Sequence, residues 1–182
     1  MTRTKSIKKL AAMIVCVAML FSLLAIGASA QTLTTGTYVN DTTGTDASGS
    51  PIYFYAVNNG QPGAAAPHGN NVVNSYDIID NGDGTFGAVI YFQTGHVQPY
   101  PGSPNYTVIV ENFETGGDIE SLFDVSEQTA TISDITAAIV TDPGSADYGR
   151  AVLPVILSFE YPELGSHPGG QNFFLKLDHF DR

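Results

Sequence analysis

The chain has 182 residues, of which 43% are hydrophobic and 14% are charged, and its formal net charge is −11. Four of its seven Lys and Arg residues and none of its eighteen acids lie in the first thirty residues, so residues 31–182 carry 3 − 18 = −15. This charge excludes polyanionic partners such as nucleic acid and anionic membrane. The one cysteine, Cys16, also lies in the first segment, which excludes disulfides and thiolate metal sites from the remainder.

Residues 1–30 have the parts of a secretory signal peptide. A basic start, "MTRTKSIKKL", precedes the apolar run "AAMIVCVAMLFSLLAIG" and then "ASA", which predicts cleavage after Ala30. An uncleaved membrane anchor is the alternative, since the run is about long enough to span a bilayer. Cys16 lacks the small residues that precede a lipoprotein cleavage site. We therefore expect a secreted or cell-surface protein with one mature domain, residues 31–182.

After this segment, short runs of β-branched and aromatic residues alternate with Gly, Pro, Asn and Asp. This pattern predicts about eight or nine strands, packed as an antiparallel β-sandwich or barrel. The expected strands are 35–40, 51–57, 74–80, 85–93, 106–113, 126–135, 136–141, 150–161 and 172–180. One helical turn is expected over 118–125, and the loop 58–71 is long enough to be mobile or functional.

The segment "DNGDGT", residues 80–85, admits two interpretations. Asp83 and Asn81 fit alternate ligand positions of a calcium loop counted back from Gly84, but Ile79 and Ile90 stand where further oxygen ligands belong. A tight hairpin explains the same residues, because Asn-Gly and Asp-Gly tolerate positive φ angles. We expect the hairpin, with a calcium site as the alternative.

Catalytic motifs are absent from the sequence. It has no G-x-S-x-G, H-E-x-x-H, phosphate loop or dinucleotide fingerprint. The histidines are far apart, at His68, His96, His167 and His179. Carboxylate pairs that could serve glycoside hydrolysis arise by chance in a chain this acidic. These observations predict a protein that is not an enzyme.

The longest expected strand, 150–161, has two different faces. Alternation places the apolar residues Leu153, Val155, Leu157 and Phe159 on one face, which we expect to be the core. Tyr148 and Arg150 lie at the start of this strand and, with Val152, Pro154 and Ile156, belong to the other face. Pro154 lacks an amide donor, which is typical of an edge strand or a bulge.

Four segments together resemble the near-iron-transporter (NEAT) domain, an immunoglobulin-like haem-binding module of secreted and cell-wall proteins in Gram-positive bacteria. They are "TGTY" (35–38), "NGDGTFGAVIYF" (81–92), "TISDITAAIVTDP" (131–143) and "VILSFE" (155–160), so the resemblance covers about residues 33–161. It implies an immunoglobulin-like sandwich with haem in a groove between the last two strands and a short helix near the start. In that family the first tyrosine of a Y-x-x-x-Y motif holds the iron.

The resemblance implies a set of site residues in this chain. Tyr148 would coordinate haem iron, Arg150 would pair with a propionate, and Ser50, Tyr53 and Tyr55 would form the lip of the groove. In the family's register, however, the two tyrosine positions fall on Gly149 and Leu153, and Tyr148 is one residue early. A bulge near Pro154 would restore the register.

The alternative interpretation of the same residues is structural. Tyr148 then ends a turn begun by "TDPGSAD", and Arg150 pairs with Asp142 or Asp147. The predicted function is a secreted binding module for haem or for a haem-carrying or host protein, since family members without the tyrosine pair commonly bind proteins. A calcium-stabilised adhesion or carbohydrate-binding module of the cell surface is the second hypothesis.

Overall fold

The computed structural model describes residues 33–39, 52–66, 69, 71–98, 102–166 and 170–177. All of them belong to one compact unit, Leu33–Arg182. The predicted signal peptide and Ser50 lie outside the described residues.

Most of these residues belong to β-strands, and one 3-10 turn, η1, spans Thr136–Ala138. The strands are β1 (Gly36–Val39), β2 (Ile52–Asn58), β3 (Gln61–Ala65), β4 (Val73–Asp80), β5 (Phe86–Phe92), β6 (Gly95–Val97), β7 (Tyr106–Thr115), β8 (Ser121–Asp124), β9 (Thr129–Ile132), β10 (Ala151–Tyr161), β11 (Gly165–Ser166) and β12 (Gln171–Leu177).

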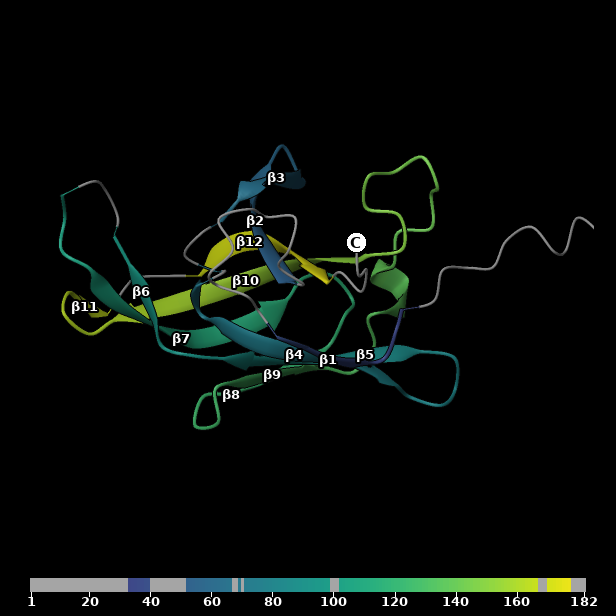
Figure 1. The fold of residues 1–182 in the computed structure, drawn as a ribbon, viewed down its shortest axis with the longest axis horizontal. Helices are drawn as coiled ribbons and strands as arrows, with labels where there is room; N and C mark the ends of the chain where they lie inside the picture. The colour runs from purple at the N-terminus through teal and green to yellow at the C-terminus, as the bar shows by residue number, and fades with distance from the viewer. Residues whose placement is uncertain are drawn as a thin grey trace, which may run out of the picture. The chain divides into compact units, whose positions relative to one another are not determined.

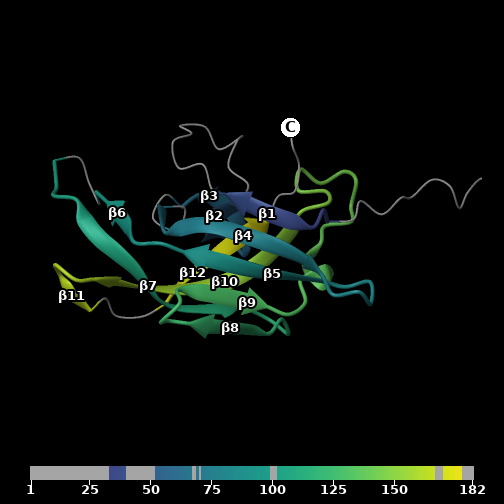
Figure 2. The same cartoon turned by 60° about the horizontal axis from the view of Figure 1, so that its bottom comes forward.

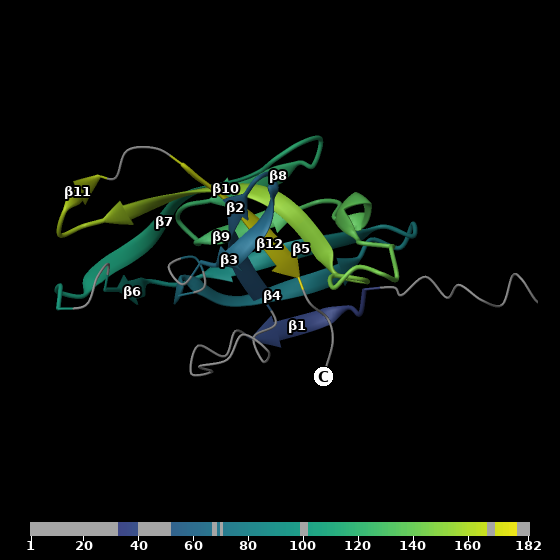
Figure 3. The same ribbon diagram turned by 90° about the horizontal axis from the view of Figure 1, so that it is seen from above.

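The strands form two antiparallel sheets, which confirms the predicted all-β sandwich (Figures 1 and 2). The first sheet has the order β1-β4-β5-β9-β8, and the second has β3-β2-β12-β10-β7-β6 with β11 paired to β10. The chain moves between the sheets several times, as it does in immunoglobulin-like sandwiches. Seen from above, β10 and β12 cross over the strands of the first sheet (Figure 3).

The core lies between the two sheets and follows from period-2 alternation. On β10 the side chains of Leu153, Val155, Leu157 and Phe159 are buried, as the sequence predicts. They meet buried residues of the first sheet, among them Tyr76, Ile90 and Ile132. Complete burial of each large apolar side chain contributes about 1.5–3 kcal/mol, so this interface holds the sandwich together without disulfides.

Two expected elements are wrong. The helical turn expected over 118–125 is instead the edge strand β8, in which Phe123 packs against the core and Leu122 is 73% exposed. The strand expected over 136–141 begins instead as η1, because the Asp134 carboxylate accepts the Thr136 N–H at 2.8 Å and turns the chain. Only a single bridge, Ile139 to Ala151, follows it in the described chain.

The loop expected over 58–71 contains strand β3, which forms a hairpin with β2. The turn is Asn59-Gly60, with φ angles of 50° and 75°, and consecutive positive φ angles are typical of a type I′ hairpin turn. The short strands β6 and β11 were also not expected from the sequence.

The hairpin expected at residues 80–85 is confirmed. Asp80 and Phe86 pair across β4 and β5, and Gly82 and Gly84 adopt φ angles of 82° and 89°. The carboxylates of Asp80 and Asp83 accept the N–H groups of Gly82 and Thr85 at 2.8 and 3.0 Å. These acids therefore stabilise the turn, and the described residues contain no group of three or more His, Cys, Asp or Glu placed to hold a metal ion.

Candidate functional site

The outer face of the second sheet carries an unusual set of side chains for a surface. On β2, β12 and β10 six neighbouring outward positions are aromatic or aliphatic, and we call these six the apolar outer face. Its members are Tyr55, Val57, Val152, Pro154, Ile156 and Phe174. Strand pairing aligns them in rows, in which Phe174 lies between Tyr55 and Pro154.

A cavity of about 310 Å³ opens on the apolar outer face. Its lining includes Val57, Gly116, Pro154, Ile156, Asn172 and Phe174. Gly116 forms part of the wall, where a Cβ atom would lie 3.3 Å from Pro154. The volume is at the lower limit of pockets that hold small organic ligands, about 300–1,000 Å³. The cavity can therefore seat one apolar group of a ligand.

Pro154 is accommodated in a central strand because a neighbouring strand stops beside it. Strand β7 pairs with β10 only from Thr115 and Val155 onward, and the Pro154 carbonyl accepts the Gly116 N–H at 2.7 Å. The missing N–H of Pro154 thus costs no ladder hydrogen bond to β7. The prediction that Pro154 marks an edge strand is wrong.

The bulge in β10 lies between Ser158 and Phe159, on the side of β7, and not near Pro154. The β10–β12 register is unbroken from Ala151 to Leu157. No shift of parity therefore occurs between Ala151 and Leu157. The bulge that the haem-ligand register requires near Pro154 is absent from this part of the strand.

Tyr148 lies in the turn that precedes β10. Its N–H donates to the Ser145 carbonyl at 3.2 Å, and the next residue, Gly149, has a φ of 80° and donates to Val140 at 2.7 Å. The Tyr148 side chain is half-buried. The turn from Asp142 to Gly149 agrees with the structural interpretation of this segment.

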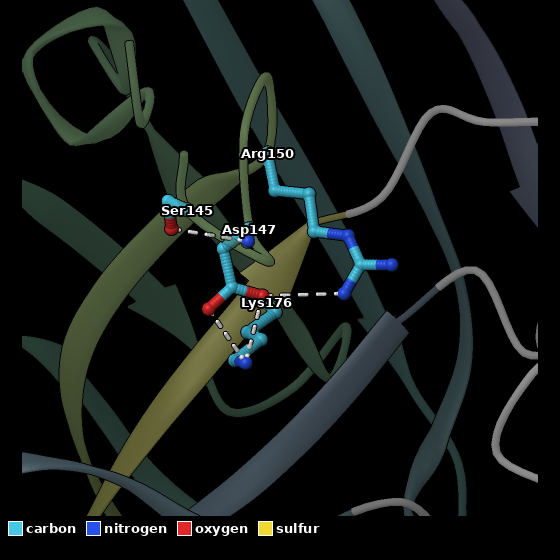
Figure 4. Close-up of polar contacts among 4 residues, drawn as sticks. All are labelled: Ser145, Asp147, Arg150 and Lys176. Carbon is cyan, nitrogen blue, oxygen red and sulfur yellow. Dashed lines mark hydrogen bonds and ion pairs between the residues drawn. The ribbon is translucent and has the colours of Figure 1, made fainter. Parts of the chain in front are cut away.

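Beside this turn, two cations share one carboxylate (Figure 4). Lys176 Nζ lies 2.8 Å from both carboxylate oxygens of Asp147, and Arg150 Nη1 lies 3.2 Å from Asp147 Oδ1. The Lys176 ammonium also lies 4.4 Å from the centre of the Tyr55 ring, within the range of a cation–π interaction. We call Asp147, Arg150 and Lys176 the charged cluster.

The charged cluster adjoins the apolar outer face. Lys176 pairs with Val152 across the sheet and follows Phe174 by two residues on β12, so both side chains project from the same side. The side chains of Arg150, Lys176 and Asp147 are 15%, 12% and 19% exposed, so each is mostly buried but keeps some contact with solvent.

The structure brings together two of the predicted site residues, Tyr55 and Arg150, through Lys176 and Asp147. Tyr53 pairs with Lys176 in the backbone register. Sequence reasoning missed Lys176 and Phe174. The alternation in "NFFLKLDHF" could have placed both opposite the buried Phe173, Leu175 and Leu177.

Comparisons of the chain with protein-family models, curated proteins and solved structures give no match. None of the helical segments in the described ranges has the length and apolar character needed to cross a membrane.

Proposed function

We propose that this protein is a secreted, non-enzymatic binding module whose ligand lies on the apolar outer face. The observation that carries the proposal is the cavity of about 310 Å³ between β2, β12 and β10, with Phe174 and Ile156 in its lining. Solvated sheet faces normally alternate to polar residues, so an aromatic and aliphatic outer face favours a binding role.

Haem, free or held by a carrier protein, is the ligand we propose. Its flat apolar ring suits the apolar outer face, and its carboxylates suit the cations at one end of that face. Tyr148 belongs to the turn that leads into Arg150, at the same end of β10, and a phenolate is a known type of haem ligand. The resemblance of the sequence to the NEAT domain supports the same ligand.

An absorbance titration of the secreted protein with ferric haem tests this proposal. We expect a saturable Soret band and a tyrosinate charge-transfer feature, with the second feature lost in Tyr148→Ala. Ile156→Asp places a carboxylate in the cavity lining and should weaken binding by at least about tenfold, because an unpaired charge must then be buried beneath an apolar ring.

Val89→Asp is the matched control. Val89 is also a half-buried aliphatic residue in a central strand, but on the outer face of the first sheet, where it pairs with Thr131 and Asp77 of the neighbouring strands. A titration without a saturable band would exclude haem and direct attention to calcium, glycans and protein partners.

A further inference from the structure

The positive charge of the described domain is concentrated at one point. Residues 31–182 contain three bases, Arg150, Lys176 and Arg182, against eighteen acids. Arg150 and Lys176 are the only Lys or Arg residues among the described ones, and both contact the same carboxylate, that of Asp147. Eighteen acids offer many separate partners, so the convergence of both cations on one of them needs an explanation.

We propose that Lys176 and Arg150 form a binding subsite for a ligand carboxylate, and that Asp147 occupies this subsite until a ligand displaces it. The inference rests on the proposed function, because it assigns the anionic part of a ligand whose apolar part lies in the cavity. Arg150 and Lys176 thus bring two positive side chains to one point of a strongly acidic domain. This is the point of the described surface where an anion is least repelled.

The geometry identifies a carboxylate as the chemical class. The Asp147 group is itself a planar carboxylate, and both of its oxygens lie 2.8 Å from Lys176 Nζ while one also meets Arg150. An ammonium with three donors and a guanidinium fork are the groups that bind carboxylates most strongly. A ligand carboxylate could make the same hydrogen bonds in place of Asp147.

The position of the charged cluster limits the distance between the apolar body of the ligand and its carboxylate. Lys176 and Phe174 are two residues apart on the same side of β12, which corresponds to about 6–7 Å along the strand. A ligand that covers Phe174 therefore needs a carboxylate on a short arm. Because Tyr55 lies beneath the Lys176 ammonium, the aromatic ring also holds the cation in place when Asp147 leaves.

A purely structural role for the cluster makes a different prediction. Asp147 belongs to the turn that precedes β10, and Lys176 belongs to β12, so the ion pairs also fasten the turn to the sheet. In that case substitutions in the cluster change stability, but they do not discriminate between charged and uncharged ligands.

The test uses two fluorescent probes with the same apolar body, 1-pyrenebutyrate and the uncharged 1-pyrenebutanol. We expect the secreted protein to prefer the acid. Lys176→Met should weaken binding of the acid by about 5–20-fold and change that of the alcohol less than about twofold, because a buried charge-assisted hydrogen bond is lost for the acid alone. Lys176→Arg keeps the charge and should keep the preference.

Asp147→Asn is the second variant, and it should change the affinity for 1-pyrenebutyrate in the opposite direction to Lys176→Met. Removal of the internal competitor should strengthen binding of 1-pyrenebutyrate by at least about threefold and leave 1-pyrenebutanol unchanged. Thermal unfolding of each variant, followed by circular dichroism, verifies that the proteins are folded.

Equal affinity of the two probes in wild type and variants, or no saturable change with either, overturns the carboxylate subsite. The haem titration is independent of this result. Haem binding with no preference for the acid probe would retain the proposed function and reject the carboxylate subsite. A preference for the acid probe without haem binding would retain the subsite and reject haem as the ligand.

Discussion

The two sheets of the sandwich have different outer faces. On the first sheet, one outward row runs through Thr37, Asp77, Val89, Thr131 and Leu122, so hydroxyls and a carboxylate are mixed with aliphatic side chains. The Tyr91 hydroxyl donates to Asp77 at 2.8 Å. This hydrogen bond raises the pKa of Tyr91. On the second sheet the corresponding positions carry Tyr55, Phe174, Pro154 and Ile156, together with the charged cluster.

The cavities on the two outer faces differ in the same way. The first sheet has a smaller cavity of about 190 Å³, lined by Glu120, Ser121, Leu122, Thr131 and Ser133. The cavity on the second sheet is larger and its lining is mostly apolar. The larger and mostly apolar cavity is the reason for which we propose the second sheet, and not the first, as the binding surface.

The largest expected effect separates the inner from the outer side of β12. Leu175 is completely buried, so Leu175→Ala should lower the free energy of unfolding by about 2–5 kcal/mol. Phe174, its neighbour, is half-buried on the outer face, and Phe174→Ala should cost only about 1 kcal/mol. Urea unfolding followed by circular dichroism measures both.

If Phe174→Ala destabilised the protein as much as Leu175→Ala, the apolar outer face would be part of the folding core, and its use as a ligand surface would be contradicted. The matched pair is informative because the two residues are adjacent, share one strand and differ only in the side of the sheet from which they project.

The sequence predicts well those features that depend on local alternation. The inner face of β10, from Leu153 to Phe159, follows from period 2 alone, and the hairpin at residues 80–85 follows from Asn-Gly and Asp-Gly. By contrast, residues 136–141 have β-branched side chains and still begin as a 3-10 turn, because one hydrogen bond from Thr136 to Asp134 overrides the weak strand preference. Strand β3 was missed because its small residues give no strand signal.

The candidate site is only partly predictable from the sequence, because part of it depends on strand pairing between distant segments. Tyr55 and Arg150 stand out in the sequence, since arginine is rare in residues 31–182 and aromatic residues gather near residue 53. Lys176 lies 29 residues from Asp147, and nothing local links them. Their contact exists because β12 pairs with the start of β10, and this strand pairing is a long-range property of the fold.

An intermediate effect is expected in the β4–β5 hairpin of the first sheet. Gly84 has a φ of 89° in open space, where an added Cβ meets no atom within 4 Å. Gly84→Ala should therefore destabilise the fold only through backbone strain, by about 1–2 kcal/mol. Haem affinity should not change if the ligand binds the second sheet, as we propose, because the substitution lies in the first. A change of more than about threefold in haem affinity would contradict the proposal that the ligand binds the second sheet alone.

The smallest effect concerns acid stability, and it belongs to the turns of the first sheet. Hydrogen bonds from the Thr85 side chain and backbone lower the pKa of Asp83, and those from Ser126 and Glu127 lower the pKa of Asp124. A carboxyl group whose pKa is lower in the folded state stabilises the fold above its unfolded value of 3.8 and loses this contribution as the pH falls through the folded value.

The urea concentration at the unfolding midpoint should therefore decrease as the pH is lowered from about 4 to about 2. This decrease should be smaller in Asp83→Asn and in Asp124→Asn. Ser126→Ala serves as a control that keeps the Asp124 charge but removes the hydrogen bond that contributes most to its shift. It should reproduce part of the Asp124→Asn effect. Parallel curves for all four proteins would mean that these turn acids do not stabilise the first sheet.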